Sequence, residues 1–331
     1  MKSLRHCQKI LFVRTDRIGD VLMNLPALRT LRQTFPKAWI ALLVDQNISG
    51  LLNGHPDLDE ILYVSMGDWK KNFTAKWRLA RKIRAIGFDL AIVSNSDKWL
   101  HWTVFAARIP ERVGYRRKWG FFLTRTVTDR KSDGSRHEIE SNLDLVKLVS
   151  ERVWDGGLAI PMDLSARESI EKRLAGGGMA NQSFVVVHPG SSNPQKRWGV
   201  SGFSSVCQTL WDREALRTIL VGGEEEKKVS RQILEQTKNT ALDWTGALSL
   251  KELVALLGHK KARALVSCDS GPVHIAWMSG TPVVALYAKN CAGSDPIRWG
   301  PRDPKSRVIF GDIREIRPEE VYRSLDEVLH A

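Results

Sequence analysis

Short apolar segments alternate with segments of helical periodicity along most of this chain, and this alternation limits the possible folds more than any other feature. The first half predicts strands at 10–14, 39–44, 60–64 and 88–94, and helices at 20–33, 47–52, 69–86, 98–108 and 137–152. Repeated strand-then-helix units build a parallel sheet with helices on both faces. The pattern therefore predicts an α/β fold with a doubly wound sheet, in which Pro26 kinks the first helix.

The alternation stops between residues 155 and 182 and then starts again. Capping-box patterns mark two helix starts, at Ser165 with Glu168 and at Ser249 with Glu252. Because 331 residues suit two domains of ordinary size, we expect two doubly wound, Rossmann-like domains that face each other across a cleft. The second half predicts strands at 183–188, 217–221, near 242, 262–267 and 282–287, and helices at 201–212, 224–236, 249–259, 272–279 and 318–330.

The formal net charge is +13, and basic residues concentrate in two aromatic-rich segments, at 69–84 and 112–136. A charge of one sign favours nucleic acid, an anionic membrane surface or a phosphorylated substrate as a partner. Two solvated, charge-rich faces are the alternative. No helix-turn-helix, zinc or RNA-binding signature is present in the sequence, so we expect no nucleic-acid partner.

The four cysteines, Cys7, Cys207, Cys268 and Cys291, lie far apart and show no metal-binding spacing. We expect free thiols, a small core role for Cys268 and no metal site. No apolar run is long enough for a signal-peptide core or a membrane span. The sequence therefore predicts a cytoplasmic protein, and its charge is consistent with peripheral contact at the inner face of the cytoplasmic membrane.

The predicted strand at 262–267 is followed by the turn Asp269-Ser-Gly-Pro, after which a helix carrying His274 begins. The first N–H groups of a helix have no partner within the helix, and the helix dipole adds partial positive charge there. This turn is therefore a candidate phosphate site, and Pro272 fits the first helical turn because its missing N–H is not needed there. A tight turn closed by a capping Asp or Ser is the alternative.

A second constellation, Arg14-Thr-Asp-Arg-Ile-Gly-Asp20, follows the first predicted strand. Gly19 permits a tight turn, and Asp20 then opens a helix at the carboxyl end of a strand, where a general base is useful. An N-capping role is the alternative for Asp20, and Asp16 is the rival carboxylate. The sequence contains neither a P-loop nor a dinucleotide-binding fingerprint.

Two more loops follow strands in the second half of the chain. The loop from Pro189 to Trp198 combines small residues and hydroxyls with Lys196 and Arg197, a composition that suits a phosphate and is also compatible with a plain loop. The segment Gly222-Gly-Glu-Glu-Glu places carboxylates at a helix start, where one of them can hold a ribose diol or only stabilise the helix. With the turn at Asp269, these loops describe a site for a nucleoside diphosphate.

Four motifs in order resemble the family 9 glycosyltransferases, which include the lipopolysaccharide heptosyltransferases. They are Arg-Ile-Gly-Asp-Val-Leu at 17–22 with Pro26-Ala-Leu, His-Pro-Gly-Ser-Ser-x-x-x-Lys-x-Trp at 188–198, Gly-Gly at 222–223, and Asp-Ser-Gly-Pro-x-His at 269–274. The resemblance runs from about residue 9 to 300, and the joint order of the motifs makes it specific. It implies a GT-B fold.

The resemblance also implies roles for individual residues. Asp20 is expected to be the general base that deprotonates the acceptor hydroxyl, and Lys196 to neutralise the departing diphosphate. Glu224 and Glu225 remain alternatives to Glu226 at the ribose. The expected donor contacts are Gly190 and Ser191 in the phosphate loop, Glu226 at the ribose, Leu248 near the base, Asp269 at the sugar, and Ser270, Gly271 and His274 at the phosphates.

The function implied is inverting, metal-independent transfer of a heptose or related sugar from an ADP-sugar to a lipopolysaccharide core or other glycolipid acceptor. No cofactor is expected beyond the nucleotide sugar as co-substrate. Residues 1–160 are expected to bind the acceptor and residues 161–315 the nucleotide sugar, while a helix in 316–331 packs back on the N-terminal domain. A GT-B-type sugar-nucleotide epimerase and a basic nucleic-acid-binding protein are the alternatives.

One strand end departs from the family pattern. The segment Ser94-Asn-Ser-Asp97 lacks the Gln-Gly pair often found there in relatives. The sequence therefore does not identify the acceptor.

Overall fold

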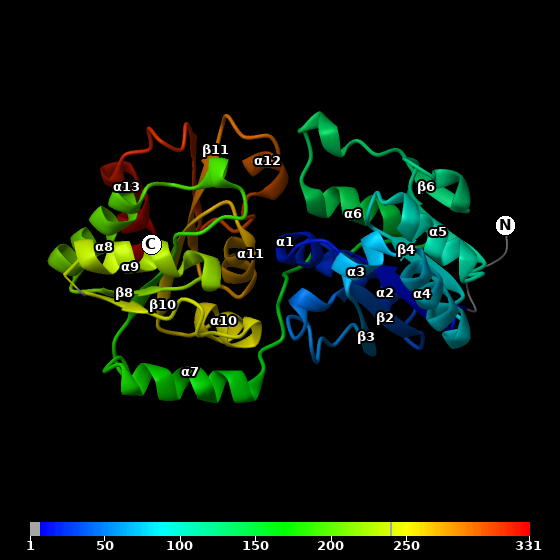
Figure 1. The fold of residues 1–331 in the computed structure, drawn as a ribbon, viewed down its shortest axis with the longest axis horizontal. Helices are drawn as coiled ribbons and strands as arrows, with labels where there is room; N and C mark the ends of the chain where they lie inside the picture. Colours follow the sequence, from blue (N-terminus) through cyan, green and yellow to red (C-terminus); the bar gives the residue numbers. More distant parts are fainter. Residues whose placement is uncertain (1–6, 239) are drawn as a thin grey trace. The chain divides into compact units, whose positions relative to one another are not determined.

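The computed structural model describes residues 7–238 and 240–331. The chain divides into two compact units, Met1–Pro161 and Met162–Ala331. Each unit is built on a six-stranded sheet in which every pair of neighbouring strands is parallel (Figure 1). The two α/β units are the doubly wound domains that the alternating pattern predicts.

The sheet of the first unit has the strand order β3-β2-β1-β4-β5-β6. Its elements are β1 (Lys9–Val13), α1 (Ile18–Leu22), α2 (Leu25–Thr34), β2 (Trp39–Asp45), η2 (Gln46–Ile48), β3 (Glu60–Val64), α3 (Met66–Lys71), α4 (Phe73–Ile86), β4 (Leu90–Val93), α5 (Lys98–Ala106), β5 (Glu111–Tyr115), η3 (Gly120–Phe122), β6 (Arg125–Val127), η4 (Lys131–Asp133) and α6 (Glu138–Val146).

The sheet of the second unit has the order β12-β11-β10-β7-β8-β9, which repeats the topology of the first when its strands are counted from β7. Its elements are α7 (Leu164–Gly176), β7 (Phe184–His188), η5 (Pro194–Lys196), α8 (Val200–Glu214), β8 (Arg217–Leu220), η6 (Glu224–Glu226), α9 (Lys227–Gln236), β9 (Ala241–Asp243), α10 (Leu250–Leu257), β10 (Ala262–Cys268), α11 (Gly271–Met278), β11 (Val283–Ala288), α12 (Pro296–Trp299), β12 (Arg307–Gly311) and α13 (Pro318–Leu329).

The central strands form the core of each unit. All residues of β4, β7 and β11 are buried, because helices cover both faces of a parallel sheet. In both units the chain direction across the sheet reverses beside the first strand, between β1 and β4 and between β7 and β10. Open α/β sheets bind ligands at the carboxyl ends of the strands at such a switch point.

Two helices predicted as continuous are each broken into two. The helix expected at 20–33 ends at Leu22 and restarts at Leu25, with Pro26 in the first turn of α2, so the expected kink is a full break. The helix expected at 69–86 is divided into α3 and α4 at Asn72. Strands β5, β6 and β12 were not predicted. Strand β5 overlaps the start of the basic segment at 112–136, and β6 lies within it.

The two capping-box predictions have different outcomes. Ser249 and Glu252 form the box at the start of α10, as expected. At α7 the N-cap is Asp163, whose carboxylate accepts from the N–H of Ala166, so the prediction of Ser165 as the cap is wrong. Asp163 stands two residues earlier and caps the helix with a carboxylate oxygen in place of the expected serine hydroxyl.

The final helix, α13, belongs to the second unit and not to the first, which corrects the expectation for residues 316–331. Its apolar side chains at helical spacing lie in the core cluster of the second sheet. The helix packs on α8 and on strands β10, β11 and β12. The apolar residues that hold it there are Val321, Leu325, Val328 and Leu329.

All four cysteines are free thiols, and Cys268 is fully buried in the core of the second unit, as expected. No helix within residues 7–238 and 240–331 is both long enough and apolar enough to cross a membrane.

Candidate functional site

The motifs singled out in the sequence lie at the two switch points, except Gly222-Gly223, which follows the neighbouring strand β8. In the first unit, Arg14 to Asp20 follow β1 and Ser94 follows β4. In the second unit, the loop at 189–198 follows β7, and Asp269 begins the turn after β10. The structure therefore places one group of candidate residues at the expected ligand-binding edge of each sheet.

In the first unit, the buried guanidinium of Arg14 is the centre of an ionic network. Its Nη2 donates to Oδ1 of Asp20, its Nε lies 3.2 Å from Oδ2 of Asp16, and its Nη1 lies 3.5 Å from Oε1 of Glu138. Nη1 also donates to the backbone oxygen of Ser94 at 2.8 Å. One cation thus contacts three carboxylates and ties the end of β1 to the end of β4.

The charges in this network shift two pKa values. Burial lowers the pKa of Arg14, but Asp20, Asp16 and Glu138 raise it more, so the group is held charged. Burial raises the pKa of Asp16, and Arg14 offsets this effect only in part. Asp16 therefore gains affinity for a proton while it remains close to Asp20.

Asp20 lies in the first turn of α1, where the helix dipole stabilises a carboxylate. The neighbouring Gly19, Val21 and Leu22 are buried, whereas the Asp20 side chain remains 19% exposed. Among the described residues, its hydrogen bond to Arg14 engages Oδ1. The contact with Arg14 holds the carboxylate in one orientation at the end of β1.

A second layer of polar residues supports Arg14. Ser94 donates from Oγ to Oδ1 of Asn24 at 2.8 Å, and Lys131 contacts the carboxylate of Glu138. Glu138 and Lys131 were not among the predicted site residues. Glu138 is 124 positions from Arg14 and fully buried at the start of an amphipathic helix, so no local pattern could reveal its role.

In the second unit, Lys196 and Asp269 form an ion pair with an Nζ to Oδ2 distance of 2.6 Å. Lys196 also donates to the backbone oxygen of Gly293 at 3.0 Å. Both side chains are largely buried, and the contact joins the loop after β7 to the turn after β10. The two residues that were assigned to the diphosphate and to the sugar are therefore brought together.

The turn after β10 is not closed by a side-chain cap. Asp269 is paired with Lys196, and Ser270, the N-cap residue of α11, makes no side-chain capping bond. Instead, Oγ of Ser270 lies 3.2 Å from Nδ1 of His188 and 3.0 Å from Oγ of Ser267. The capped-turn alternative is therefore wrong, and the N-terminus of α11 is left for another hydrogen-bond acceptor.

His188, Ser267 and Ser270 thus contact one another pairwise, and His188 is buried. Its Nδ1 is also 3.0 Å from Oγ of Ser267, and burial lowers its pKa to about 4. At neutral pH the ring is uncharged, so it acts as a hydrogen-bond partner that orients the hydroxyls of Ser267 and Ser270. In the sequence, His188 stands within the motif at 188–198, where no local pattern indicates this role.

Among the three adjacent glutamates, Glu226 is the one packed on Gly190 and Gly222. A Cβ atom placed on Gly190 would lie 2.5 Å from Cγ of Glu226, and one placed on Gly222 would lie 2.8 Å from its Cβ. Oε2 of Glu226 accepts from the N–H of Gly223 at 2.8 Å. Glu224, by contrast, is exposed and pairs with Lys227.

The remaining predicted residues occupy different environments. Ser191 is buried, and its backbone oxygen accepts from Nε of Arg197 at 2.7 Å. Leu248 is half-buried beside the N-cap of α10. Gly271 begins α11, whereas His274 is buried one turn later with its ring centre 6.3 Å from that of Trp299.

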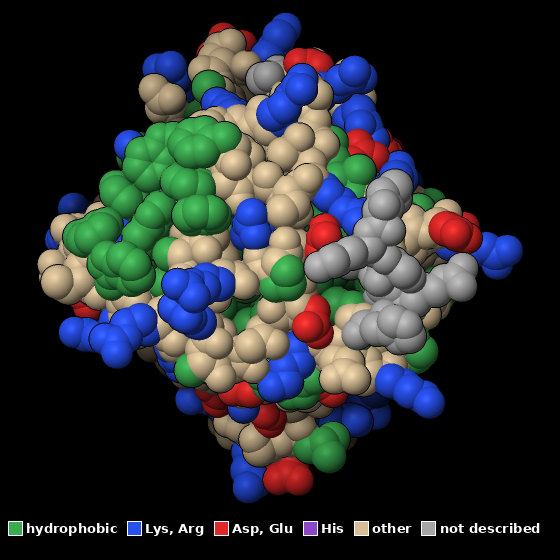
Figure 2. All heavy atoms as spheres, turned by 90° about the vertical axis from the view of Figure 1, so that its right-hand side faces the viewer, with side chains coloured by type: hydrophobic (Ala, Val, Ile, Leu, Met, Phe, Trp, Pro, Cys, Tyr) green, Lys and Arg blue, Asp and Glu red, His purple; other side chains and the backbone are tan. Residues whose placement is uncertain are grey.

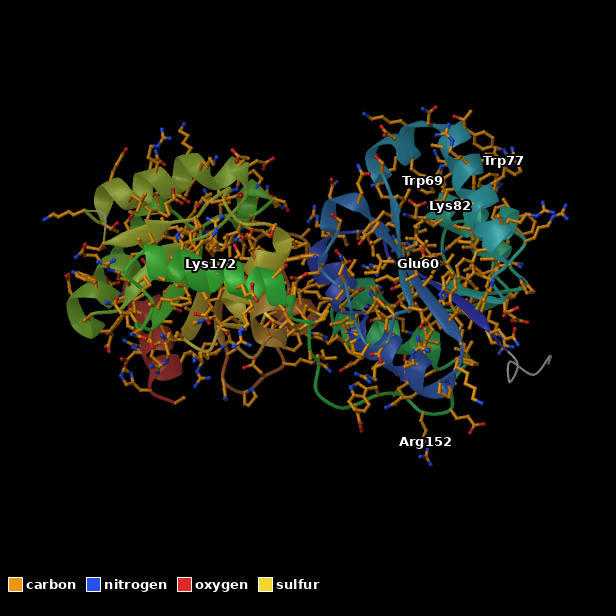
Figure 3. The ribbon with its side chains drawn as sticks, turned by 90° about the horizontal axis from the view of Figure 1, so that it is seen from below. Glu60, Trp69, Trp77, Lys82, Arg152 and Lys172 are labelled. Carbon is orange, nitrogen blue, oxygen red and sulfur yellow. The ribbon has the colours of Figure 1, made fainter. Side chains whose placement is uncertain are left out.

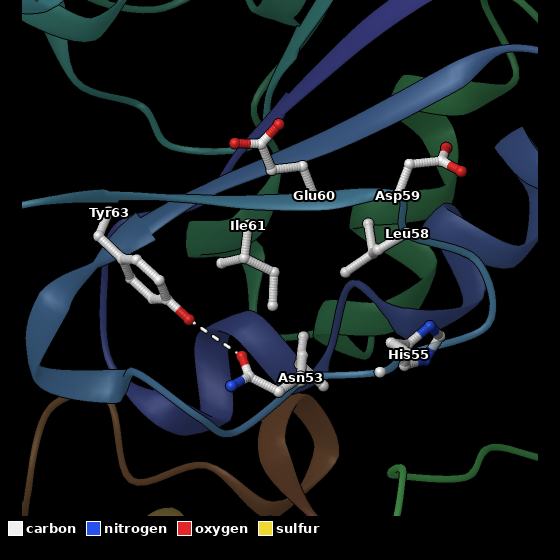
Figure 4. Close-up of a pocket in the computed structure, with 9 residues that line it drawn as sticks. Asn53, His55, Leu58, Asp59, Glu60, Ile61 and Tyr63 are labelled. Carbon is white, nitrogen blue, oxygen red and sulfur yellow. Dashed lines mark hydrogen bonds between the residues drawn. The ribbon is translucent and has the colours of Figure 1, made fainter.

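Two other features lie apart from these residues. In the part of the chain that the structure describes, the one cluster with ligand spacing for a metal ion is Glu214 with Asp326 and His330, at the surface of the second unit. A pocket of about 330 Å³ lies at strand β3, where Tyr63 donates to Oδ1 of Asn53 at 3.0 Å (Figure 4). Neither feature includes a predicted site residue.

Comparison with known proteins gives consistent matches along the chain. Residues 76–329 match the model of glycosyltransferase family 9 (heptosyltransferase). Lipopolysaccharide heptosyltransferase 3 of Escherichia coli is 26% identical over 317 residues, which cover 90% of this chain and 88% of the relative.

Two solved structures share the fold. The family 9 glycosyltransferase of Veillonella parvula superposes with a TM-score of 0.87 at 22% identity, covering 98% of this chain and 97% of that one. The ADP-heptose lipopolysaccharide heptosyltransferase II of Escherichia coli superposes with a TM-score of 0.79 at 22% identity, covering 98% of this chain and 99% of that one.

Proposed function

The chain belongs to glycosyltransferase family 9, and on this premise we propose that it transfers heptose from ADP-heptose to a lipopolysaccharide core or a related surface glycan, with inversion. The observation that carries the proposal is the pair of equivalent switch points. One holds an oriented carboxylate, and the other holds a cation beside an uncapped helix N-terminus. Transfer of a glycosyl group needs both kinds of group.

In the proposed reaction, the acceptor oxygen attacks the anomeric carbon of the donor while the bond from that carbon to the diphosphate oxygen breaks. Asp20 takes the proton of the acceptor hydroxyl as the new carbon–oxygen bond forms. The electron pair of the broken bond leaves with ADP. Attack from the face opposite the leaving group inverts the anomeric configuration.

Lys196 and the N-terminus of α11 would stabilise the departing diphosphate. Lys196 supplies a full positive charge, and the N–H of Gly271 supplies a hydrogen bond at the positive end of the helix dipole. Because Asp269 holds Lys196 in place at 2.6 Å, the cation is positioned in advance. Such preorganised charge is the largest contribution in many enzymes, and here it takes the role that a metal ion has elsewhere.

The other contacts complete the donor site. We propose that Glu226 holds the ribose diol, since it lies over Gly190 and Gly222. Leu248 would contact the adenine, and Asp269 would bind hydroxyls of the sugar. The phosphate contacts would come from Gly190, Ser191, Ser270, Gly271 and His274.

The acceptor in this proposal is a glycolipid, so the enzyme works at the inner face of the cytoplasmic membrane. The family match favours transfer over the epimerase alternative. An epimerase would act on the nucleotide sugar alone, without an acceptor. The two reactions therefore differ in their products.

The test is to incubate the full chain with ADP-heptose and heptose-free lipopolysaccharide core, and to measure ADP release and the mass of the product. We expect one added heptose, and slower or no transfer from UDP- and GDP-sugars. Lys196→Met should lower kcat by about 10²-fold, as loss of an oxyanion-stabilising group does, whereas Lys172→Met, on the exposed face of α7, should not. An epimerised donor without transfer, or equal rates in the two variants, would overturn the proposal.

A further inference from the structure

An aromatic surface covers part of the first unit. Phe73 and Trp77 of α4, Phe105 of α5 and Phe121 of η3 are exposed, and the exposed fractions reach 45% for Trp77 and 75% for Phe121. Trp77 packs on Trp102 with ring centres 5.1 Å apart. The space-filling view shows a continuous hydrophobic area flanked by Lys and Arg side chains on this side of the unit (Figure 2).

The rings form one connected and rigid cluster. The ring centre of Phe122 lies 4.7 Å from that of Phe105 and 4.4 Å from that of Phe121. Trp119 and Trp99 connect these rings to the rings of α4. Lys98 lies over Trp119, with its Nζ 5.3 Å from the ring centre. Because the cluster is already packed, binding through it needs little ordering of side chains.

The positive charge of the protein is concentrated in the same elements. Residues 69–88 and 98–128 contain 14 of the 50 Lys and Arg residues but one of the 37 Asp and Glu residues, which leaves 36 of each sign elsewhere. That single acid, Glu111, is paired with Arg125 at 3.1 Å. The net charge of +13 therefore lies in the two segments that carry the aromatic surface.

The cations are exposed around the rings. Lys70 and Lys71 end α3 beside Phe73, and Arg78 and Lys82 lie on α4 with Trp77. Figure 3 labels Trp77 and Lys82 on the same side of the first unit. Exposed aromatic rings interleaved with Lys and Arg are typical of surfaces that lie in the headgroup region of a bilayer.

We propose that this aromatic surface docks the enzyme on a membrane rich in anionic lipid, with the rings at the headgroup level and the cations on lipid phosphates. The use of this contact rests on the proposed function, because a glycolipid acceptor lies in such a membrane. The charge argues against a second copy of the chain, since two surfaces of the same sign repel each other.

The ring geometry argues against single-stranded nucleic acid. Bases stack on open aromatic faces. The tryptophans of this cluster pack edge to face, with interplanar angles of 87° between Trp77 and Trp102 and 80° between Trp99 and Trp102, whereas the phenylalanine pairs of Phe122 are tilted by 34° and 46°. The edge-to-face contacts leave fewer open tryptophan faces for bases, so the geometry favours a lipid headgroup layer over a single strand.

The test is co-sedimentation of the full chain with phosphatidylcholine vesicles that contain or lack phosphatidylglycerol. We expect binding only with the anionic lipid, reduced at high salt. The double variant Trp77→Ser with Phe121→Ser should weaken binding at least tenfold. Phe310→Ser, at a 49% exposed aromatic residue of β12 in the second unit, is the matched control and should bind like the parent protein.

A charge variant tests the basic residues around the aromatic surface. Arg78→Glu with Lys82→Glu should weaken vesicle binding by a similar factor, whereas Lys172→Glu on α7 should not. Thermal unfolding and ADP affinity of every variant should match the parent protein, which shows that the changes affect docking and not folding. Equal vesicle binding by the aromatic variant and its control would overturn the proposal.

Activity separates this proposal from the proposed function. The aromatic variant should transfer sugar normally to a deacylated, water-soluble acceptor and poorly to acceptor embedded in vesicles. No transfer to either acceptor, with vesicle binding intact, would contradict the proposed function alone. A parent protein that does not bind anionic vesicles would contradict the docking proposal alone. The same holds if it instead self-associates or binds single-stranded RNA and the aromatic variant loses that binding.

Discussion

The two units share one topology, yet the ends of their central strands are built from different chemistry. At the end of β1 and β4, Arg14 binds three carboxylates of its own unit. At the end of β7 and β10, one ion pair and a neutral histidine surround a helix N-terminus that no side chain caps. The same fold therefore provides an edge filled by charges of the protein in one unit and an edge with an uncapped helix N-terminus in the other.

The difference shows how topology and side chains divide the work. Strand order determines where backbone N–H groups and loop residues gather. The side chains then decide whether that place is already filled by charges of the protein or is left open for a ligand. The following predictions test this contrast between the two units.

The largest effect is expected at Asp20. Asp20→Asn keeps the size of the side chain but removes the proposed general base, so kcat should fall about 10²–10⁴-fold, while ADP affinity should stay unchanged. Steady-state rates and calorimetric titration with ADP measure the two quantities. Asp16→Asn is the matched control, because Asp16 contacts the same guanidinium. A larger loss of kcat in Asp16→Asn would identify Asp16 as the base.

The next largest effect is expected at Arg14. Arg14→Met leaves the carboxylates of Asp16, Asp20 and the fully buried Glu138 without their common cation, which should lower the free energy of unfolding by about 3–5 kcal/mol. Urea denaturation followed by circular dichroism measures this change. In the second unit, Arg197→Met removes one hydrogen bond to Ser191 and should cost about 1 kcal/mol. Similar losses in both variants would contradict the contrast between the two edges.

The third prediction concerns pH. Burial lowers the pKa of His188 from 6.5 to about 4, so the unfolded chain takes up a proton as pH falls below 6.5 whereas the folded chain does not until about pH 4. The free energy of unfolding is therefore unaffected by the titration of His188 above pH 6.5. It falls by about 1.4 kcal/mol per pH unit as the pH decreases from 6.5 to 4.

The control for this prediction lies in the first unit. His188→Asn retains a polar side chain but does not titrate, and it should flatten the dependence of stability on pH in that window. Burial and Arg29 lower the pKa of His55 to about 4 as well, so His55→Asn should flatten the same curve without changing ADP affinity. An unchanged slope in His188→Asn would show that burial does not shift this group.

The smallest effect distinguishes the adjacent glutamates. Glu226→Gln should weaken ADP binding about tenfold, because a charge-assisted hydrogen bond to the ribose contributes about 1.5–3 kcal/mol and part of it survives in the amide. Glu224→Gln should leave ADP binding unchanged, since Glu224 is exposed and pairs with Lys227. Calorimetric titration of both variants measures the difference, and a larger effect in Glu224→Gln would reassign the ribose contact.

The limits of sequence analysis follow from where each residue lies. Strand β3 was predicted at its observed bounds, Glu60–Val64, because an apolar run bounded by polar residues is a local signal. Strand β6 has only three residues, Arg125–Val127, and the apolar run of β12 is limited to three residues between Arg307 and Gly311, so neither segment has a local signal as long as that of β3. The expected position of α13 was wrong because the sequence shows which face of a helix is apolar but not which sheet that face covers.

The sequence by itself determined the two α/β units, the motifs at the ends of the central strands and the carboxylate at Asp20, because periodicity and turn residues act over a few positions. Tertiary structure alone decided that Arg14 joins three carboxylates, that Asp269 pairs with Lys196, and that the aromatic rings of α4, α5 and η3 form one surface. These contacts join residues far apart in the chain, so they exist only after parallel strands bring the ends of distant segments to the same edge.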